Sequence, residues 1–352
     1  MELTQPTPSL AIPTSHRLSF TGSGREYFGI WIVNLLLSIV TLGIYSAWAK
    51  VRRTQYFARN TELDGARFDY HGDPMLILKG RLIAFGLFLF YQLASHANPY
   101  FGLAVGIMLA GVFPYLLLKS LHFRLYNLSY RGLRFRFTGA TKDAYVTFLA
   151  WPLAALFSFY LLAPLCHQRI KRFQHDHSAF GQTLFSFHAP ARSFYKLYLQ
   201  ALGLFLLAGA VVVGGLYYSL QAKLISPQGN LSTLAILVPF GVAVLAVFII
   251  QPFLSARLQN LIWNHTRLGA HRFESRASVW RLFGIQFTNL LGILLTLGLY
   301  RPFAVVRLYR YRSETVTLLA ADTLDNFIAA NSNQTGALGD ETAEMFDIDI
   351  AL

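Results

Sequence analysis

Two asparagines lie within long apolar stretches of the sequence, and they are the polar side chains that we single out first. Asn34 lies in the uncharged run 27–49, and Asn289 lies in the uncharged run 282–300. An unpaired amide in an apolar environment costs several kcal/mol, so each side chain should face protein or water. We expect the two to lie near a shared polar patch with Thr41, Thr288 and Thr296.

Two alternative roles fit these asparagines. A hydrogen bond between helices would contribute roughly 0.6–2 kcal/mol and would be structural only. The functional alternative is that the pair lines a pathway where repeated units meet, as the repeats of transporters do. Both roles require side chains that face the interior of the protein.

Three arginines, Arg52, Arg169 and Arg307, are candidates for binding an anion. They occupy the same position in the repeated pattern described below. An arginine at the end of a membrane helix usually extends its guanidinium towards lipid phosphate. We therefore expect these three to contact anionic headgroups, with a more specific anionic ligand as the alternative.

The other reactive side chains form no familiar catalytic or metal-binding motif. His175-Asp176-His177 supplies two imidazoles, but a zinc site needs further ligands, and Cys166 is the single cysteine. No P-loop, Rossmann glycine fingerprint, HExxH helix or nucleophile elbow is present. We expect no enzyme activity, no bound metal and no cofactor.

The composition indicates a membrane protein. Hydrophobic residues make up 54% of the chain and charged residues 13%, whereas a soluble domain has about 25% charged residues. The net charge of +13 comes from Lys and Arg at the ends of apolar runs, which indicates cytoplasmic loops and anionic lipid rather than nucleic acid. The uncharged runs are 27–49, 82–118, 144–166, 197–222, 224–256 and 282–300.

Internal repeats are evident when the sequence is compared with itself. Residues 28–56 align without gaps to 283–311, with 14 identities in 29 positions. A weaker third copy lies between them, where Phe137-Thr138-Gly139 matches Phe20-Thr21-Gly22. The identical pairs include Asn34/Asn289, Thr41/Thr296, Gly43/Gly298, Tyr45/Tyr300 and Arg52/Arg307.

A second recurring pattern follows the basic helix ends. Asn60, Gly65 and Phe68 have the same spacing as Asn127, Gly132 and Phe135, and related patterns end at Phe185 and Phe273. Glycine and asparagine tolerate the positive φ of tight turns, and alternating aromatics are typical of strands. The pattern predicts short basic β-hairpins between the membrane helices.

These motifs resemble a known family. Phe20-Thr21-Gly22, the stretch TLGIYSAWAKVR at 41–52, Asn60-Thr61 and Leu63-Asp64-Gly65 are similar to the YjgN family of bacterial inner-membrane proteins. The resemblance covers roughly residues 17–315 and is strongest in the first repeat. It implies a multi-pass inner-membrane protein and supplies no reaction, substrate or catalytic residue.

The positions of the charges suggest an unusual topology. Loops 50–81, 119–142, 167–196, 257–281 and 301–312 are basic, whereas the turns near 96–100 and 223–230 are almost uncharged. If 144–166 crossed the membrane once, its two basic flanks would lie on opposite sides, against the positive-inside rule. Its 23 residues are also too few to cross twice. One solution is that 27–49, 144–166 and 282–304 are broken or re-entrant helices, with breaks favoured by Gly43, Gly298, Pro152, Pro164 and Pro302. Seven ordinary spans are the alternative.

The expected fold class is therefore an all-α polytopic membrane protein with short cytoplasmic β-hairpins, internal repeats, and broken or re-entrant helices. We expect a flexible N-terminus at 1–16, a repeat-built membrane domain at 17–315, and an acidic tail at 316–352. The repeats would span about 17–118, 119–256 and 257–315.

Two functions fit this organisation. Repeats and broken helices favour transport of a small solute or lipid. The alternative is a structural or regulatory membrane protein that acts through its basic hairpins and binds anionic lipid headgroups.

Overall fold

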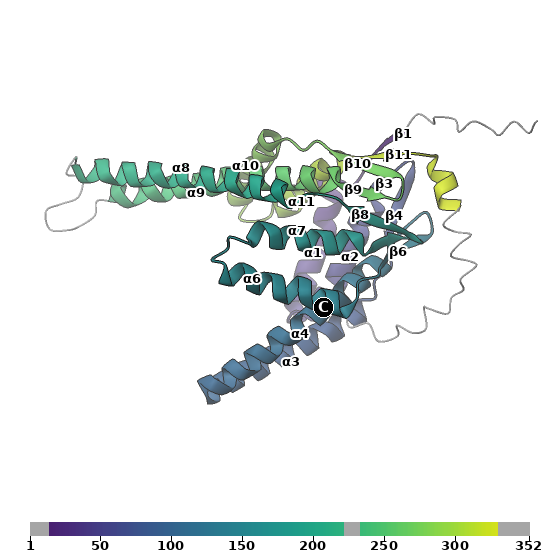
Figure 1. The fold of residues 1–352 in the computed structure, drawn as a ribbon, viewed down its shortest axis with the longest axis horizontal. Helices are drawn as coiled ribbons and strands as arrows, with labels where there is room; N and C mark the ends of the chain where they lie inside the picture. Colours follow the sequence, from purple (N-terminus) through teal and green to yellow (C-terminus); the bar gives the residue numbers. More distant parts are fainter. Residues whose placement is uncertain (1–13, 222–232, 330–352) are drawn as a thin grey trace, which may run out of the picture.

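Five helical hairpins joined by short strands make up the described part of the chain (Figure 1). The computed structural model describes residues 14–221 and 233–329, so the expected turn at 223–230 and most of the acidic tail lie outside the described residues. The helices are α1 Gly24–Val40, α2 Ser46–Arg59, α3 Pro74–Ala97, α4 Pro99–Tyr126, α5 Thr141–Tyr145, the π-helix η1 Val146–Ala150, α6 Trp151–Phe157, α7 Ala163–Asp176, α8 Ala191–Gln221, α9 Thr233–Asn264, α10 Val279–Leu295 and α11 Arg301–Glu314.

All the strands belong to one antiparallel, nearly closed barrel with the order β1-β11-β10-β9-β8-β7-β6-β5-β4-β3-β2. Leu18 joins the two ends of this order, and its amide donates a hydrogen bond to the carbonyl of Val316. The strands are β1 Thr14–Arg17, β2 Ser19–Phe20, β3 Thr61–Leu63, β4 Ala66–Tyr70, β5 Leu128–Tyr130, β6 Leu133–Phe137, β7 Ser178–Phe180, β8 Thr183–Phe187, β9 Thr266–Leu268, β10 His271–Ser275 and β11 Val316–Ala320.

The prediction of an all-α fold with separate short hairpins is wrong. The hairpins form at the predicted places, but each also pairs with the next one, as Phe68 of β4 does with Tyr130 of β5. An isolated two-stranded hairpin is marginally stable and leaves unpaired backbone groups at both edges. Pairing all the hairpins in a ring satisfies those groups and produces a barrel.

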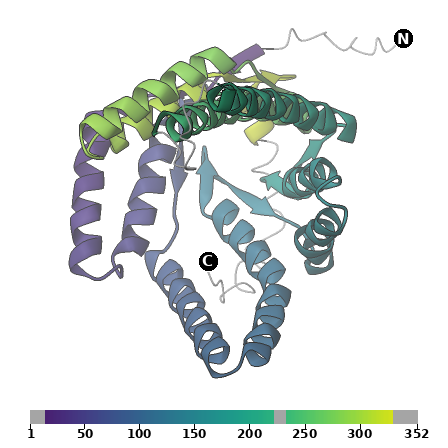
Figure 2. The ribbon, with the colours of Figure 1, turned by 90° about the vertical axis from the view of Figure 1, so that its left-hand side faces the viewer.

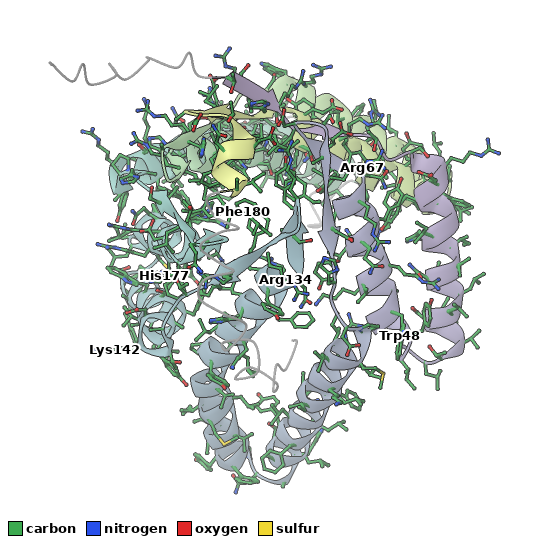
Figure 3. All side chains as sticks on the ribbon, turned by 90° about the vertical axis from the view of Figure 1, so that its right-hand side faces the viewer. Trp48, Arg67, Arg134, Lys142, His177 and Phe180 are labelled. Atoms are coloured by element: carbon green, nitrogen blue, oxygen red, sulfur yellow. The ribbon has the colours of Figure 1, made fainter. Side chains whose placement is uncertain are left out.

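Phenylalanines fill the barrel at one level. The rings of Phe68 and Phe135 have centroids 6.4 Å apart, those of Phe135 and Phe185 are 6.4 Å apart, and those of Phe185 and Phe273 are 6.1 Å apart. They pack against a buried cluster that includes Phe180 and Leu324. In Figure 3, Phe180 lies near the centre of the ring of strands, whereas Lys142 and Trp48 lie on helices at its periphery.

Three of the helical hairpins are sharply broken. Leu42 and Leu297 both have φ of 50°, and Gly43 and Gly298 have φ of 93° and 96°, a conformation that favours glycine. The breaks predicted at the two glycines are confirmed. In the middle hairpin the break lies at Ser158–Leu162, between the predicted breakers Pro152 and Pro164, each of which stands in the first turn of a helix.

The helical hairpins form a ring above the barrel (Figure 2). Each packs against the next, through α2 with α3, α4 with α5, α7 with α8 and α9 with α10, and α11 packs against α1 to close the ring. β1 pairs with β11, with Thr14 opposite Ala320, so the first and last strands of the chain lie side by side in the barrel.

Hairpin length divides the helices into two classes. Pro74–Ala97, Pro99–Tyr126 and the stretch Ala191–Tyr218 of α8 are long and apolar enough to cross a membrane. The α1/α2 and α10/α11 hairpins have shorter helices of 14 to 17 residues, or about 21–26 Å at 1.5 Å per residue. The middle hairpin is also short, because α7 has 14 residues. The turns of these short hairpins expose large apolar side chains: Leu42 and Leu297 are 95% exposed, and Phe159 is 90% exposed.

Candidate functional site

A pocket of about 420 Å³ lies between α9, α10 and α11. Its walls are mainly apolar and include Phe248, Leu290 and Ile293. Four polar side chains also line it, namely Gln251, Gln286, Asn289 and Arg301. This combination of an apolar wall with a few placed polar groups is typical of small-ligand sites.

Asn289 is the buried polar group of this pocket. Its side chain is 6% exposed, and its amide nitrogen donates a hydrogen bond of 3.1 Å to the carbonyl of Ala304 on α11. The amide oxygen has no hydrogen-bond partner within the described residues. Leaving a buried acceptor unpaired costs about 1–3 kcal/mol, so this oxygen is suited to accept a hydrogen bond from a bound molecule.

Asn34 occupies the matching position on α1. It is 7% exposed, and its amide oxygen also has no partner among the described residues. α1 and α10 both pack against α11, and no hydrogen bond between described residues joins the two asparagines. The two amides therefore share their burial and an unpartnered oxygen, but only Asn289 lines the pocket, and no hydrogen bond links them.

The three threonines have local hydrogen-bond partners. Thr41 donates to the carbonyl of Leu37 at 2.7 Å and accepts from the amide of Tyr45 at 2.9 Å, and Thr296 makes the same pair of bonds with Gly292 and Tyr300. The hydroxyls of Thr41 and Thr296 therefore stabilise the sharp turns between the two helices of each hairpin. Thr288 donates to the carbonyl of Gly284 at 2.7 Å.

The three arginines singled out by the sequence are all exposed and lie on the second helix of a short hairpin. The guanidinium of Arg52 lies 5.8 Å from the ring centre of Tyr45, and that of Arg169 lies 5.3 Å from the ring centre of Trp151. Arg307 donates to the hydroxyl of Thr288 at 2.7 Å. They remain available to an anion, because aromatic rings and a hydroxyl leave most guanidinium donors free.

The histidine pair at 175 and 177 has structural partners. Burial lowers the pKa of His175 to about 4, with a further contribution from the charge of Lys171. Its ring lies 5.4 Å from that of Phe187, between α7 and the barrel. Asp176 accepts a hydrogen bond from the amide of Phe187 at 2.6 Å, and His177 bonds the carbonyl of Phe173 at 3.0 Å.

Sequence reasoning missed Gln286, Gln251 and Arg301 as neighbours of Asn289. Gln286 precedes Asn289 by three residues, and this spacing on a helix places two side chains on one face. That signal was available in the sequence. Arg301 joins them only because the turn after Thr296 folds α11 back along α10, and Gln251 comes from another hairpin.

A ring of helical hairpins, of which several helices are long and apolar enough to cross a bilayer, defines a multi-pass membrane protein. The chain belongs to the family described as bacterial protein of unknown function (DUF898), whose model matches residues 15–345.

Curated relatives agree with this class. The chain is 30% identical over 149 residues to the inner membrane protein YjgN of Salmonella typhimurium, which covers 42% of this chain and 38% of the relative. It is 33% identical over 144 residues to the inner membrane protein YjgN of Escherichia coli O157:H7, covering 40% of this chain and 36% of the relative. The chain thus matches less than two-fifths of the length of either relative.

No solved structure matches the chain. The predicted family resemblance and the predicted location in the bacterial inner membrane are confirmed by the family match and the relatives. The protein is a multi-pass inner-membrane protein.

Proposed function

We propose that this protein binds membrane lipid in the pocket between α9, α10 and α11 and moves it within the bilayer. The observation that carries the proposal is the unpartnered amide oxygen of Asn289 in a pocket whose walls are mainly apolar. A lipid offers apolar chains for the wall formed by Phe248, Leu290 and Ile293, and hydroxyl or amine donors for the amide. Arg301 adds a positive charge for the lipid phosphate.

A water-filled path for solutes through the barrel is the less favoured form of transport. Phe68, Phe135, Phe185 and Phe273 stack around the barrel interior and pack on the buried cluster that contains Phe180 and Leu324. Aromatic rings at this density exclude water. A lipid needs no such path, because it enters from the side.

The proposed placement puts the helical ring in the membrane and the barrel in the cytoplasm. The long hairpins α3/α4 and α8/α9 would cross the bilayer, and the three short ones would enter it part of the way with their exposed apolar turns. The basic loops at the barrel end of the hairpins fit the positive-inside rule. Partial insertion suits lipid movement, because short hairpins leave lipid-facing gaps between the long ones.

We also propose that the helical hairpins, each with a strand before and after it, are internal repeats. The 14 identities between 28–56 and 283–311, and the matching φ of Gly43 and Gly298, support a common origin for the α1/α2 and α10/α11 units.

The proposal is tested by replacing Asn289 with Leu. The variant retains the apolar wall but lacks the amide oxygen, so the full-length protein purified in mild detergent should retain less phospholipid. Native mass spectrometry would count the bound lipids. Loss of one weak hydrogen bond to Ala304 is offset by removing an unpaired polar atom, so thermal stability without lipid should change little.

Asn34→Leu is the matched control, because it removes an equally buried amide on α1. Lipid retention should then be normal. Equal lipid retention in wild-type protein and Asn289→Leu would contradict the proposal, and so would equal losses in the two variants.

The alternative function, a structural or regulatory role, is supported by the outer face of the barrel. Arg67, Arg134, Arg267 and Arg272 are exposed and alternate with inward-facing side chains, so they form a basic surface. Such a surface would bind anionic headgroups or an acidic partner. This alternative function is favoured if Asn289→Leu leaves lipid retention unchanged.

A further inference from the structure

Positive side chains point into the helical ring just above the barrel. On α2, Lys50 is nine residues before Arg59, so the two point in opposite directions from the helix axis. Arg59 faces outward, because it pairs at 2.8 Å with Asp69, which alternates in β4 with the inward-facing Phe68. Lys50 therefore faces inward.

Arg124 on α4 faces the same interior. It precedes Tyr126 by two residues, which places the two side chains about 200° apart around the helix. Tyr126 faces outward, since its ring lies 4.7 Å from the guanidinium of Arg134 on the outer face of β6. The inward direction of Arg124 follows.

Four cations from different helices meet in this interior. The ammonium of Lys50 is close enough to Arg81 and Arg124 to be repelled by both, and Arg124 also repels Lys171 on α7. Arg81 donates a hydrogen bond to the hydroxyl of Ser46, which fixes it between α3 and α2. Burial, followed by the charge of Arg124, lowers the pKa of Lys171.

This group has no acidic counterpart in the described chain. The described ion pairs join other bases to carboxylates, namely Arg59, Arg131, Arg172, Arg276 and His16. Cations of like charge that converge without a counter-ion repel one another, and a bound anion would offset this repulsion.

We propose that Lys50, Arg81, Arg124 and Lys171 form a binding site for a phosphate group inside the helical ring. Arginine matches phosphate oxygens with two parallel hydrogen bonds, and lysine adds point charge. Arg81 directly precedes the uncharged run that starts at residue 82, so the site lies at the depth where a bilayer has its phosphates. The site uses α2, α3, α4 and α7, and is independent of the pocket at Asn289.

The phosphate has two possible sources, a phospholipid headgroup or free phosphate, which one experiment separates. The full-length protein is placed in nanodiscs of phosphatidylcholine alone, in the same nanodiscs with inorganic phosphate added, and in nanodiscs with phosphatidylglycerol. The thermal unfolding midpoint is measured in each. An increase only with phosphatidylglycerol assigns the site to a headgroup, and an increase with inorganic phosphate assigns it to the free ion.

The variant Arg124→Gln should remove the increase, or raise the concentration needed for half of it roughly tenfold or more. Arg59→Gln, which removes an outward-facing charge from the helix that carries Lys50, should retain it. Lys171→Gln is the second variant in case Arg124→Gln does not fold, because it removes a charge whose burial is unfavourable. The proposal is overturned if neither anion raises the midpoint, or if Arg59→Gln reduces the increase in the midpoint as much as the inner-face variants do.

Discussion

The barrel and the helical ring place their apolar side chains on opposite sides. In the barrel, Phe135 and Phe185 point inward, and Arg67 and Arg272 are exposed outside. In the helical ring, many large apolar side chains are exposed, and among them Leu42 and Leu297 are the most exposed. The first arrangement suits water outside and the second suits lipid. This difference supports the proposed placement of the membrane edge between the two layers.

The largest expected effect comes from a matched pair of truncations, Phe135→Ala in the barrel and Leu42→Ala at a hairpin turn. Phe135→Ala removes a ring that packs on Phe68, Phe180 and Phe185, and should lower the free energy of unfolding by about 3 kcal/mol. Leu42→Ala should change it by less than about 0.5 kcal/mol in detergent, because the side chain has almost no protein contacts. Chemical denaturation followed by tryptophan fluorescence would measure both, and similar losses would contradict the proposed division.

Acidification should cause a smaller loss of stability, because it protonates His175. Its pKa is about 4 in the folded protein and about 6.5 in the unfolded chain, so the folded state resists protonation. The contribution of neutral His175 to the free energy of unfolding is complete above pH 6.5. This contribution falls as the pH drops towards 4, by at most about 3 kcal/mol. Thermal unfolding midpoints between pH 7 and pH 4.5 would measure the loss.

His175→Asn should reduce this acid sensitivity, since asparagine does not titrate. His188→Asn, at an exposed position before α8, is the control and should leave the pH profile unchanged. An unchanged profile in His175→Asn would show that another group causes the acid effect.

The sequence was informative about local structure and much less so about the pairing of strands. Gly65 and Gly132 marked tight turns, and they have φ of 71° and 81°. Gly43 and Gly298 marked the breaks in the helices. The pairing of Phe68 with Tyr130 joins residues that are 62 positions apart, and no local pattern encodes such a partner. An aromatic at every second strand position indicated a buried face, but not that the faces converge in one barrel.

For the candidate site, too, the sequence indicated local neighbours but not residues that come from other elements. Asn289 was recognisable because an amide in an apolar run is rare, and Gln286 stood three residues away on the same helix face. Arg301 and Gln251 join them through a turn and a neighbouring hairpin. The inward-facing Lys50 and Arg124 were hidden among many other basic residues, because only the barrel distinguishes their side of the helix from the outer one.

Cysteine labelling in cells tests the membrane placement most directly. In a Cys166→Ser background, single cysteines replace Leu42, Leu297, Arg67 and Asn98, and a membrane-impermeant maleimide is added to intact cells or to inverted vesicles. We expect Arg67→Cys to react only in inverted vesicles, Asn98→Cys at the α3/α4 turn only in intact cells, and Leu42→Cys and Leu297→Cys in neither. Labelling of Leu42→Cys in intact cells, or of Arg67→Cys there, would contradict partial insertion of the short hairpins or a cytoplasmic barrel.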